Sequence, residues 1–97
     1  MRNKENVVFW AREKGILDKA TPITQGLKTL EEVNELLVAI VNDDREEIKD
    51  AIGDIVVTVI IQAEMRGMDI EDCLESAYNI IKYRKGKMVN GQFVKEQ

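Results

Sequence analysis

Apolar residues recur with a helical period along most of the chain, and glycine, proline and aspartate divide them into segments. A first helix is expected over residues 4–14, ending at Gly15, which suits the left-handed position that follows a helix. Thr21 and Pro22 fit the N-cap and the first position of a second helix, which continues to Val41. The apolar residues of this second helix cover about half of its circumference.

A turn at residues 42–44 precedes a third helix, and Asp43 with Glu46 resembles its capping box. The helix is expected to end at Gly67. Residues 55–61 in its middle are β-branched throughout and by propensity alone could form a strand. We favour a helix because this run continues the register of the acidic positions before it, with no turn signal between them.

From Ile55 onward the third helix is apolar on nearly every side, so we expect it to be buried all round. A chain this small can hardly enclose a whole helix. Self-association as a homodimer or homotetramer is therefore expected.

A fourth helix is expected over residues 70–85, with Asp69 as its cap and Gly86 as its stop. The tail at residues 88–94 places Asn-Gly between apolar pairs, which is the strongest short signal for a β-hairpin. Because a lone hairpin is marginally stable, we expect it to pack on the body or on a neighbouring subunit. The pattern thus predicts one all-α domain over residues 1–97, with four helices in a homo-oligomeric bundle and a short C-terminal hairpin.

The composition narrows the classes of function. The chain is 44% hydrophobic and 33% charged with a net charge of −4, which argues against docking on nucleic acid or on an anionic membrane. Cys73 is the single cysteine, so no internal disulfide can form, and the start of the chain lacks the apolar region of a signal peptide. Both features favour a cytoplasmic protein. The absence of histidine excludes histidine triads and His-containing zinc sites.

Acidic residues line one side of each of two successive helices. At about 100° per residue, Glu32 and Glu35 share a side of the second helix, and Glu47, Asp50 and Asp54 share a side of the third. Like charges crowded on one side of a helix repel each other and lower stability. Asp54 directly precedes the most apolar stretch of the chain, so its carboxylate is expected to be partly desolvated and to need a partner. Two facing acidic stripes are what a hard divalent cation such as Mg²⁺ requires.

Salt bridges are the alternative explanation for these acids. Lys28 and Lys49 stand close enough along the chain to neutralise some of the carboxylates. Charged helix faces are more often solvated surface than binding sites.

Glu32-x-x-Glu35 followed by Gly53-Asp54 resembles the MazG-like family of all-α nucleoside triphosphate pyrophosphohydrolases. Four further segments look like the short phage-type members of this family, so the resemblance covers nearly the whole chain. These segments are residues 10–17, 21–32, 50–54 and 77–91.

The family pattern is Glu-x-x-Glu, a gap, then Glu-x-x-Asp. Glu32 and Glu35 match the first pair and Asp54 matches the last acid, but Ala51 stands where the third acid is expected. The candidates to replace it as a metal ligand are Asp50 and, one turn earlier, Glu47.

The resemblance implies hydrolysis of a nucleoside or deoxynucleoside triphosphate to monophosphate and pyrophosphate, with Mg²⁺ or Mn²⁺ as cofactor. A metal-activated water suits these residues as the nucleophile. Glu32 and Glu35 are the expected catalytic residues and metal ligands, together with Asp54. Glu35 is also a candidate for orienting or deprotonating the water.

Several side chains are candidates for binding the substrate. Lys28 lies one turn before the first acids, and by analogy with the family we place Asn79 and Lys82 near the phosphates. Trp10 could stack on a base and Gln25 could read a base edge.

A function of a different class stays open. In a non-catalytic helical interaction module, the acids would be solvated and the apolar third helix would serve as a dimerisation element. The departure from the family pattern at Ala51 favours this alternative.

Overall fold

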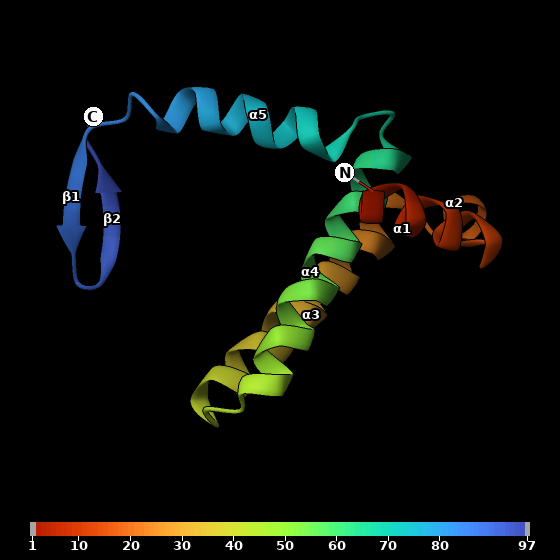
Figure 1. Cartoon of the computed structure of the whole chain (residues 1–97), viewed down its shortest axis with the longest axis horizontal. Helices are drawn as coiled ribbons and strands as arrows, with labels where there is room; N and C mark the ends of the chain where they lie inside the picture. Colours follow the sequence, from red (N-terminus) through yellow and green to blue (C-terminus); the bar gives the residue numbers. More distant parts are fainter. Residues whose placement is uncertain (1, 97) are drawn as a thin grey trace.

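The helices and strands follow the order expected from the sequence, with one short helix added. The structure is a computed structural model, and it describes residues 2–96. Its elements, shown in Figure 1, are α1 (Arg2–Glu13), α2 (Ile16–Lys19), α3 (Pro22–Val41), α4 (Arg45–Met65), α5 (Ile70–Ile81), β1 (Gly86–Val89) and β2 (Gln92–Lys95). The expected all-α fold with a hairpin tail is confirmed.

The two long helices α3 and α4 lie side by side as an antiparallel pair that forms the centre of the molecule (Figure 1). Thr21 caps α3 as expected: the Thr24 backbone N–H donates to the Thr21 hydroxyl oxygen at 3.1 Å. The predicted cap of α4 is wrong by one residue. Asp44 is the N-cap and accepts from the backbone N–H of Glu47, whereas Asp43 takes a positive φ of 49° that turns the chain.

Small residues let α3 and α4 approach each other closely. The buried apolar residues are Ala11, Ala39, Ala51, Ile60, Ile61 and Ala63. Within one chain α4 is not buried all round from Ile55 onward, since Val56 is 43% exposed, so the expected burial on every side stays a prediction about an assembly of several chains. One chain covers only the sides of α4 that face α3 and α1, and the other side stays open.

The N-terminal helix α1 packs against α4, and α2 contacts both of them. Gly15 joins α1 to α2 with φ 78°, a left-handed conformation that glycine adopts without steric cost. This confirms Gly15 as the end of the first helix. The short helix α2, which follows it at once, was not expected.

The last helix α5 leads away from the α3–α4 pair and ends in the hairpin (Figure 1). It stops at Ile81 instead of Lys85, and Gly86 begins β1 instead of ending the helix. A Cβ on Gly86 would collide with the Val94 carbonyl oxygen and the Phe93 ring, so the close approach of the strands requires glycine there.

The Asn-Gly signal predicts the turn of the hairpin correctly. Asn90 and Gly91 have positive φ values of 50° and 80°, which are typical of a type I′ turn, and Val89 pairs with Gln92. Among residues 2–96, no helix is both long and apolar enough to cross a membrane.

Candidate functional site

Three carboxylates from the two long helices meet in one place. Glu32 and Glu35 project from α3 and Asp54 projects from α4, and one oxygen of each lies within 4.8 Å of the others. The i, i+3 spacing on α3 turns both glutamates toward α4. Three of the five acids that the sequence singles out therefore converge.

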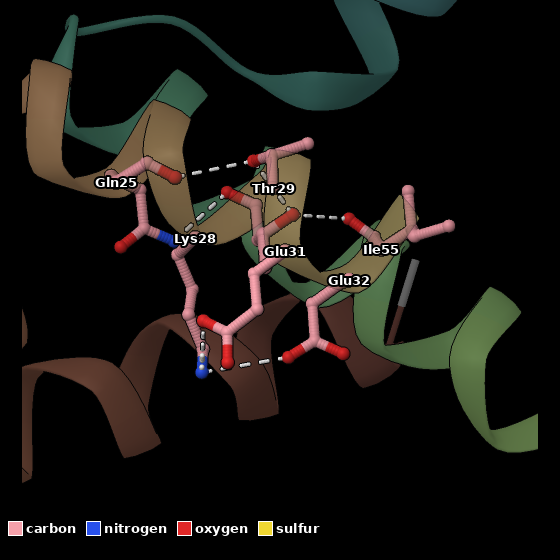
Figure 2. A network of polar contacts seen from close by, with 7 residues as sticks. Gln25, Lys28, Thr29, Glu31, Glu32 and Ile55 are labelled. Carbon is pink, nitrogen blue, oxygen red and sulfur yellow. Dashed lines mark hydrogen bonds and ion pairs between the residues drawn. The ribbon is translucent and has the colours of Figure 1, made fainter. Parts of the chain in front are cut away.

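Glu32 is the buried member of this cluster. Its residue is 7% exposed, and within residues 2–96 its Oε2 atom has no hydrogen-bond partner. The other oxygen, Oε1, lies 3.5 Å from the Lys28 ammonium, which also contacts Glu31 at 3.2 Å (Figure 2). Burying a carboxylate oxygen without a partner is unfavourable, so the fold leaves one ligand atom unsatisfied.

The electrostatics of Glu32 follow from this placement. Burial, which removes water from the carboxylate, raises the pKa of Glu32, and the adjacent Glu35 carboxylate raises it further. The positive charge of Lys28 acts in the opposite direction but does not cancel these effects. The folded chain thus concentrates negative charge that a cation would relieve.

Polar contacts behind the cluster fix how the two helices pair. The Thr29 hydroxyl donates to the Thr58 hydroxyl oxygen at 2.9 Å, and the Thr58 hydroxyl donates to the Ile55 carbonyl at 2.7 Å. The side-chain amide of Gln25 donates to the Thr58 carbonyl at 3.2 Å. Gln25 is buried, so in this chain its amide N–H₂ holds α3 to α4 (Figure 2).

The donor set fits a hard divalent cation. Carboxylate oxygens are the preferred ligands of Mg²⁺ and Mn²⁺. The three carboxylates bring one oxygen each within 4.8 Å of the others, and Glu32 also holds a buried oxygen without a hydrogen-bond partner among residues 2–96, so these residues fit a shared cation.

The two acids expected to replace the missing glutamate lie outside the cluster. Asp50 is exposed and is not among the three converging carboxylates. Glu47 lines a separate cavity of about 350 Å³ with Glu35. Ala51 is buried on α4, one turn before Asp54, and its methyl group offers no ligand atom.

A groove leads away from the cluster along α1. One hollow of about 220 Å³ is lined by Trp10, Lys28, Glu32 and Asp54, among others. A second hollow of about 400 Å³ shares Trp10 and Asp54 with it. Trp10 is 47% exposed, so its ring is available to a ligand in either hollow.

Two asparagines in this groove were missed from the sequence. Asn3 and Asn6 line the second hollow with Trp10, and the Asn6 amide donates to the Asn3 carbonyl oxygen at 3.4 Å. The i, i+3, i+7 spacing of these three residues places them on one face of α1. This spacing is visible in the sequence, so it could have indicated that the two asparagines lie beside Trp10.

Asn79 and Lys82 lie on and after α5, away from the cluster of their own chain (Figure 1). The Lys82 ammonium instead lies over the rings of Tyr78 and Tyr83, at 5.7 and 5.2 Å from their centres. A single chain therefore does not bring these two candidates to the acids.

Comparisons with known proteins agree with the resemblance seen in the sequence. Residues 20–89 match the MazG nucleotide pyrophosphohydrolase domain. The chain is also 32% identical over 65 residues to an uncharacterised 18.2 kDa protein from the rep-hol intergenic region of Haemophilus phage HP1. That alignment covers 67% of this chain and 40% of the phage protein. No solved structure matches the chain significantly.

Proposed function

Because the chain belongs to the MazG nucleotide pyrophosphohydrolase family, we propose that it hydrolyses a nucleoside or deoxynucleoside triphosphate to the monophosphate and pyrophosphate. The observation that carries this proposal is the convergence of Glu32, Glu35 and Asp54, in which Glu32 is buried and its Oε2 atom has no hydrogen-bond partner among residues 2–96. Mg²⁺ is the proposed cofactor, and Mn²⁺ is the alternative.

The three acids would hold the cation. When bound, Mg²⁺ supplies charge that offsets the phosphates and lowers the pKa of a coordinated water. Glu32 and Asp54 suit ligation, because the first is buried with a free oxygen and the second faces it from the other helix. Glu35 is more exposed and suits the role of orienting the attacking water.

The proposed reaction consumes one water molecule. Its oxygen bonds to the α-phosphorus, the bond between that phosphorus and the oxygen that bridges to the β-phosphorus breaks, and the water proton passes to a carboxylate such as Glu35. Pyrophosphate leaves with the electron pair of the broken bond. Lys28, half-exposed beside the cluster, attracts the triphosphate toward this point.

The groove beside the acids would receive the nucleoside. The exposed ring of Trp10 offers a stacking face, and the amides of Asn3 and Asn6 present both donors and acceptors to a base edge. Gln25 lines the hollow nearer the acids, where its amide oxygen stays a candidate for the base.

The test is a panel of canonical and modified triphosphates incubated with Mg²⁺, with pyrophosphate and orthophosphate measured separately. Pyrophosphate is the expected first product, and Glu35→Gln should lower its release at least about 100-fold. Glu31→Gln is the matched control, because Glu31 is exposed and outside the cluster. Orthophosphate as the first product, or full activity of Glu35→Gln, would refute the assignment.

The non-catalytic interaction module stays the second candidate, since the chain exposes many large apolar residues. Thermal melting separates the two functions. A catalytic site should give a higher melting temperature with Mg²⁺ and a non-hydrolysable triphosphate, because ligands that bind only the folded state stabilise it. No shift at millimolar metal and nucleotide would favour the interaction module.

A further inference from the structure

Hydrogen bonds link α3 to α4 in successive turns, and the acidic cluster occupies the next turn of this series. The side-chain amide of Gln62 donates to the Pro22 carbonyl oxygen at 2.9 Å, near one end of the helix pair. Gln25 and Thr29, which Figure 2 shows in successive turns of α3, both form hydrogen bonds to Thr58. The three acids of the cluster lie one turn further along both helices.

The contact between Thr29 and Thr58 lies directly beside the cluster. Thr58 follows Asp54 by four residues on α4, and Thr29 precedes Glu32 by three residues on α3. Residues three or four positions apart lie on the same face of a helix, about one turn from each other. The bond between the two hydroxyls therefore crosses the helix pair one turn away from the space between Glu32 and Asp54.

The hydroxyl of Thr58 is oriented by its own helix. It donates to the Ile55 carbonyl oxygen at 2.7 Å, so its single proton is used within α4. Its oxygen can then only accept, and it accepts from the Thr29 hydroxyl at 2.9 Å. Thr58 is 4% exposed, so little water competes for this oxygen. The two threonines thus hold the helices at a distance set by one short O–H···O bond.

The distance between the helices determines how the three acids can share a cation. Glu32 and Glu35 belong to one helix, so their separation does not depend on how α3 and α4 pair. Asp54 belongs to the other helix, and its distance from both glutamates does depend on the pairing. Oxygen ligands lie about 2.0–2.1 Å from Mg²⁺ and about 2.3–2.6 Å from Ca²⁺. A change of a few tenths of an ångström in the helix spacing would therefore favour one cation over the other.

An apolar contact in place of the hydroxyl bond would change the spacing by such an amount. Non-bonded carbon atoms pack best at about 3.5–4.0 Å, whereas the two hydroxyl oxygens are 2.9 Å apart. Thr58→Val would therefore widen this part of the helix pair by up to about 1 Å. The substitution leaves the Thr29 hydroxyl with an acceptor, because the Gln25 carbonyl oxygen lies 3.2 Å from it. Valine also keeps the β-branched shape of threonine.

We propose that Thr29 and Thr58 are positioning residues of the acidic cluster, which set its width and so select a small cation such as Mg²⁺ over a larger one such as Ca²⁺. The inference rests on the proposed function for the presence of a divalent cation at Glu32, Glu35 and Asp54. The role of the threonines rests on the contacts between the helices. Neither threonine is a ligand, because each hydroxyl is engaged in bonds within or between the helices.

Titrations with the metals alone test this selection. Wild type, Thr58→Val and Thr58→Ser are freed of metal with EDTA, dialysed, and titrated calorimetrically with Mg²⁺ and separately with Ca²⁺. Thr58→Val is expected to raise the Kd for Mg²⁺ at least about tenfold and to change the Kd for Ca²⁺ less than about threefold. Thr58→Ser keeps the hydroxyl and should keep the wild-type ratio of the two Kd values. Thr29→Val removes the same bond from the side of α3 and should reproduce the shift, which keeps the test valid if Thr58→Val does not fold.

Gln62→Met is the matched control, because Gln62 bridges the same two helices two turns away from Asp54. It should leave the ratio of the two Kd values unchanged, whatever its effect on the melting temperature. An unchanged ratio in the valine variants, a shifted ratio in Thr58→Ser, or the same shift in Gln62→Met would each overturn the role of the threonines.

The outcomes also separate this inference from the proposed function. A wild-type protein that binds neither metal would refute the proposed cofactor and the selection together. Tight Mg²⁺ binding with an unchanged ratio in the valine variants would refute only the selection. A shifted ratio in a protein that releases no pyrophosphate would refute the proposed hydrolysis and leave the selection standing.

Discussion

Glu32 holds a buried carboxylate oxygen that has no hydrogen-bond partner within the described residues 2–96, so Glu32→Gln is expected to stabilise the metal-free protein. An unsatisfied buried polar group costs about 1–3 kcal/mol, and Gln, which has the same size, removes the buried charge and replaces its repulsion with the Glu35 carboxylate by an amide that can donate to it. The Lys28 ammonium at 3.5 Å offsets part of this cost, and the half-exposed position of Lys28 limits the offset. We therefore expect a gain of about 1 kcal/mol, which corresponds to a rise of about 4–8 °C in melting temperature for a domain of this size.

The same substitution should remove the response to metal. Free Mg²⁺ at about 100 times its Kd stabilises a protein with one site by about 2.7 kcal/mol. Wild type should show a metal-dependent rise in melting temperature and Glu32→Gln should not. Melting curves are recorded at one fixed protein concentration, with and without EDTA, because self-association makes the melting temperature depend on concentration.

The pH dependence supplies an independent check. Because the pKa of Glu32 is raised in the folded state, the folded protein binds this proton more tightly than the unfolded chain does. The contribution of Glu32 to metal-free stability therefore falls as pH rises from its ordinary pKa through its raised one. The stability difference between Glu32→Gln and wild type should grow over that interval and then stay level.

Glu31→Gln is the control, since Glu31 shares Lys28 but lies outside the cluster. It should neither raise the metal-free melting temperature nor abolish the metal effect. If Glu32→Gln melts below wild type in EDTA, the carboxylate is a satisfied structural group. The reasoning from the unpartnered oxygen would then be wrong.

Two further predictions concern Ala51 and the N-cap of α5, Asp69. Ala51→Glu adds a carboxylate one turn before Asp54. The variant should need about tenfold less Mg²⁺ for half-maximal stabilisation, and it should be less stable than wild type without metal. If the Mg²⁺ concentration for half-maximal stabilisation does not change, this position does not reach the ion. The Lys4 ammonium lies 2.7 Å from the Asp69 carboxylate and lowers the pKa of Asp69, so this cap of α5 should weaken as pH falls through that lowered value. Lys4→Met should shift the Asp69 titration, followed by carboxyl ¹³C NMR, toward higher pH, and identical titration curves would contradict the ion pair.

Local signals predicted most of the helix ends and the hairpin turn. Thr21-Pro22, Gly15 and Asn90-Gly91 each act through the conformation of one or two residues, so no tertiary information is needed to interpret them. Gly86 misled the prediction because glycine serves two purposes. It can end a helix, but here it permits the close approach of two strands.

The sequence predicted which side of each helix carries the residues of the candidate site. Periodicity placed Glu32 and Glu35 on one face and Asp54 on a face of the next helix. Helical periodicity alone could not decide whether Asp54 or Asp50 lies nearest to Glu32 and Glu35. The answer depends on the distance between the two helices and on how far one is shifted along the other. The tertiary packing of α3 against α4 brings Asp54, and not Asp50, to Glu32 and Glu35.

The sequence by itself determined an all-α chain with a hairpin tail and acids aligned along two helices, because these features depend on residues a few positions apart. Only the tertiary structure decided that Glu32 is buried with an oxygen that has no hydrogen-bond partner among residues 2–96, that Trp10 borders the cluster, and that α5 leads away from the α3–α4 pair (Figure 1). These facts arise from distances between residues far apart in the chain. Such distances depend on packing over the whole molecule, which no short segment encodes.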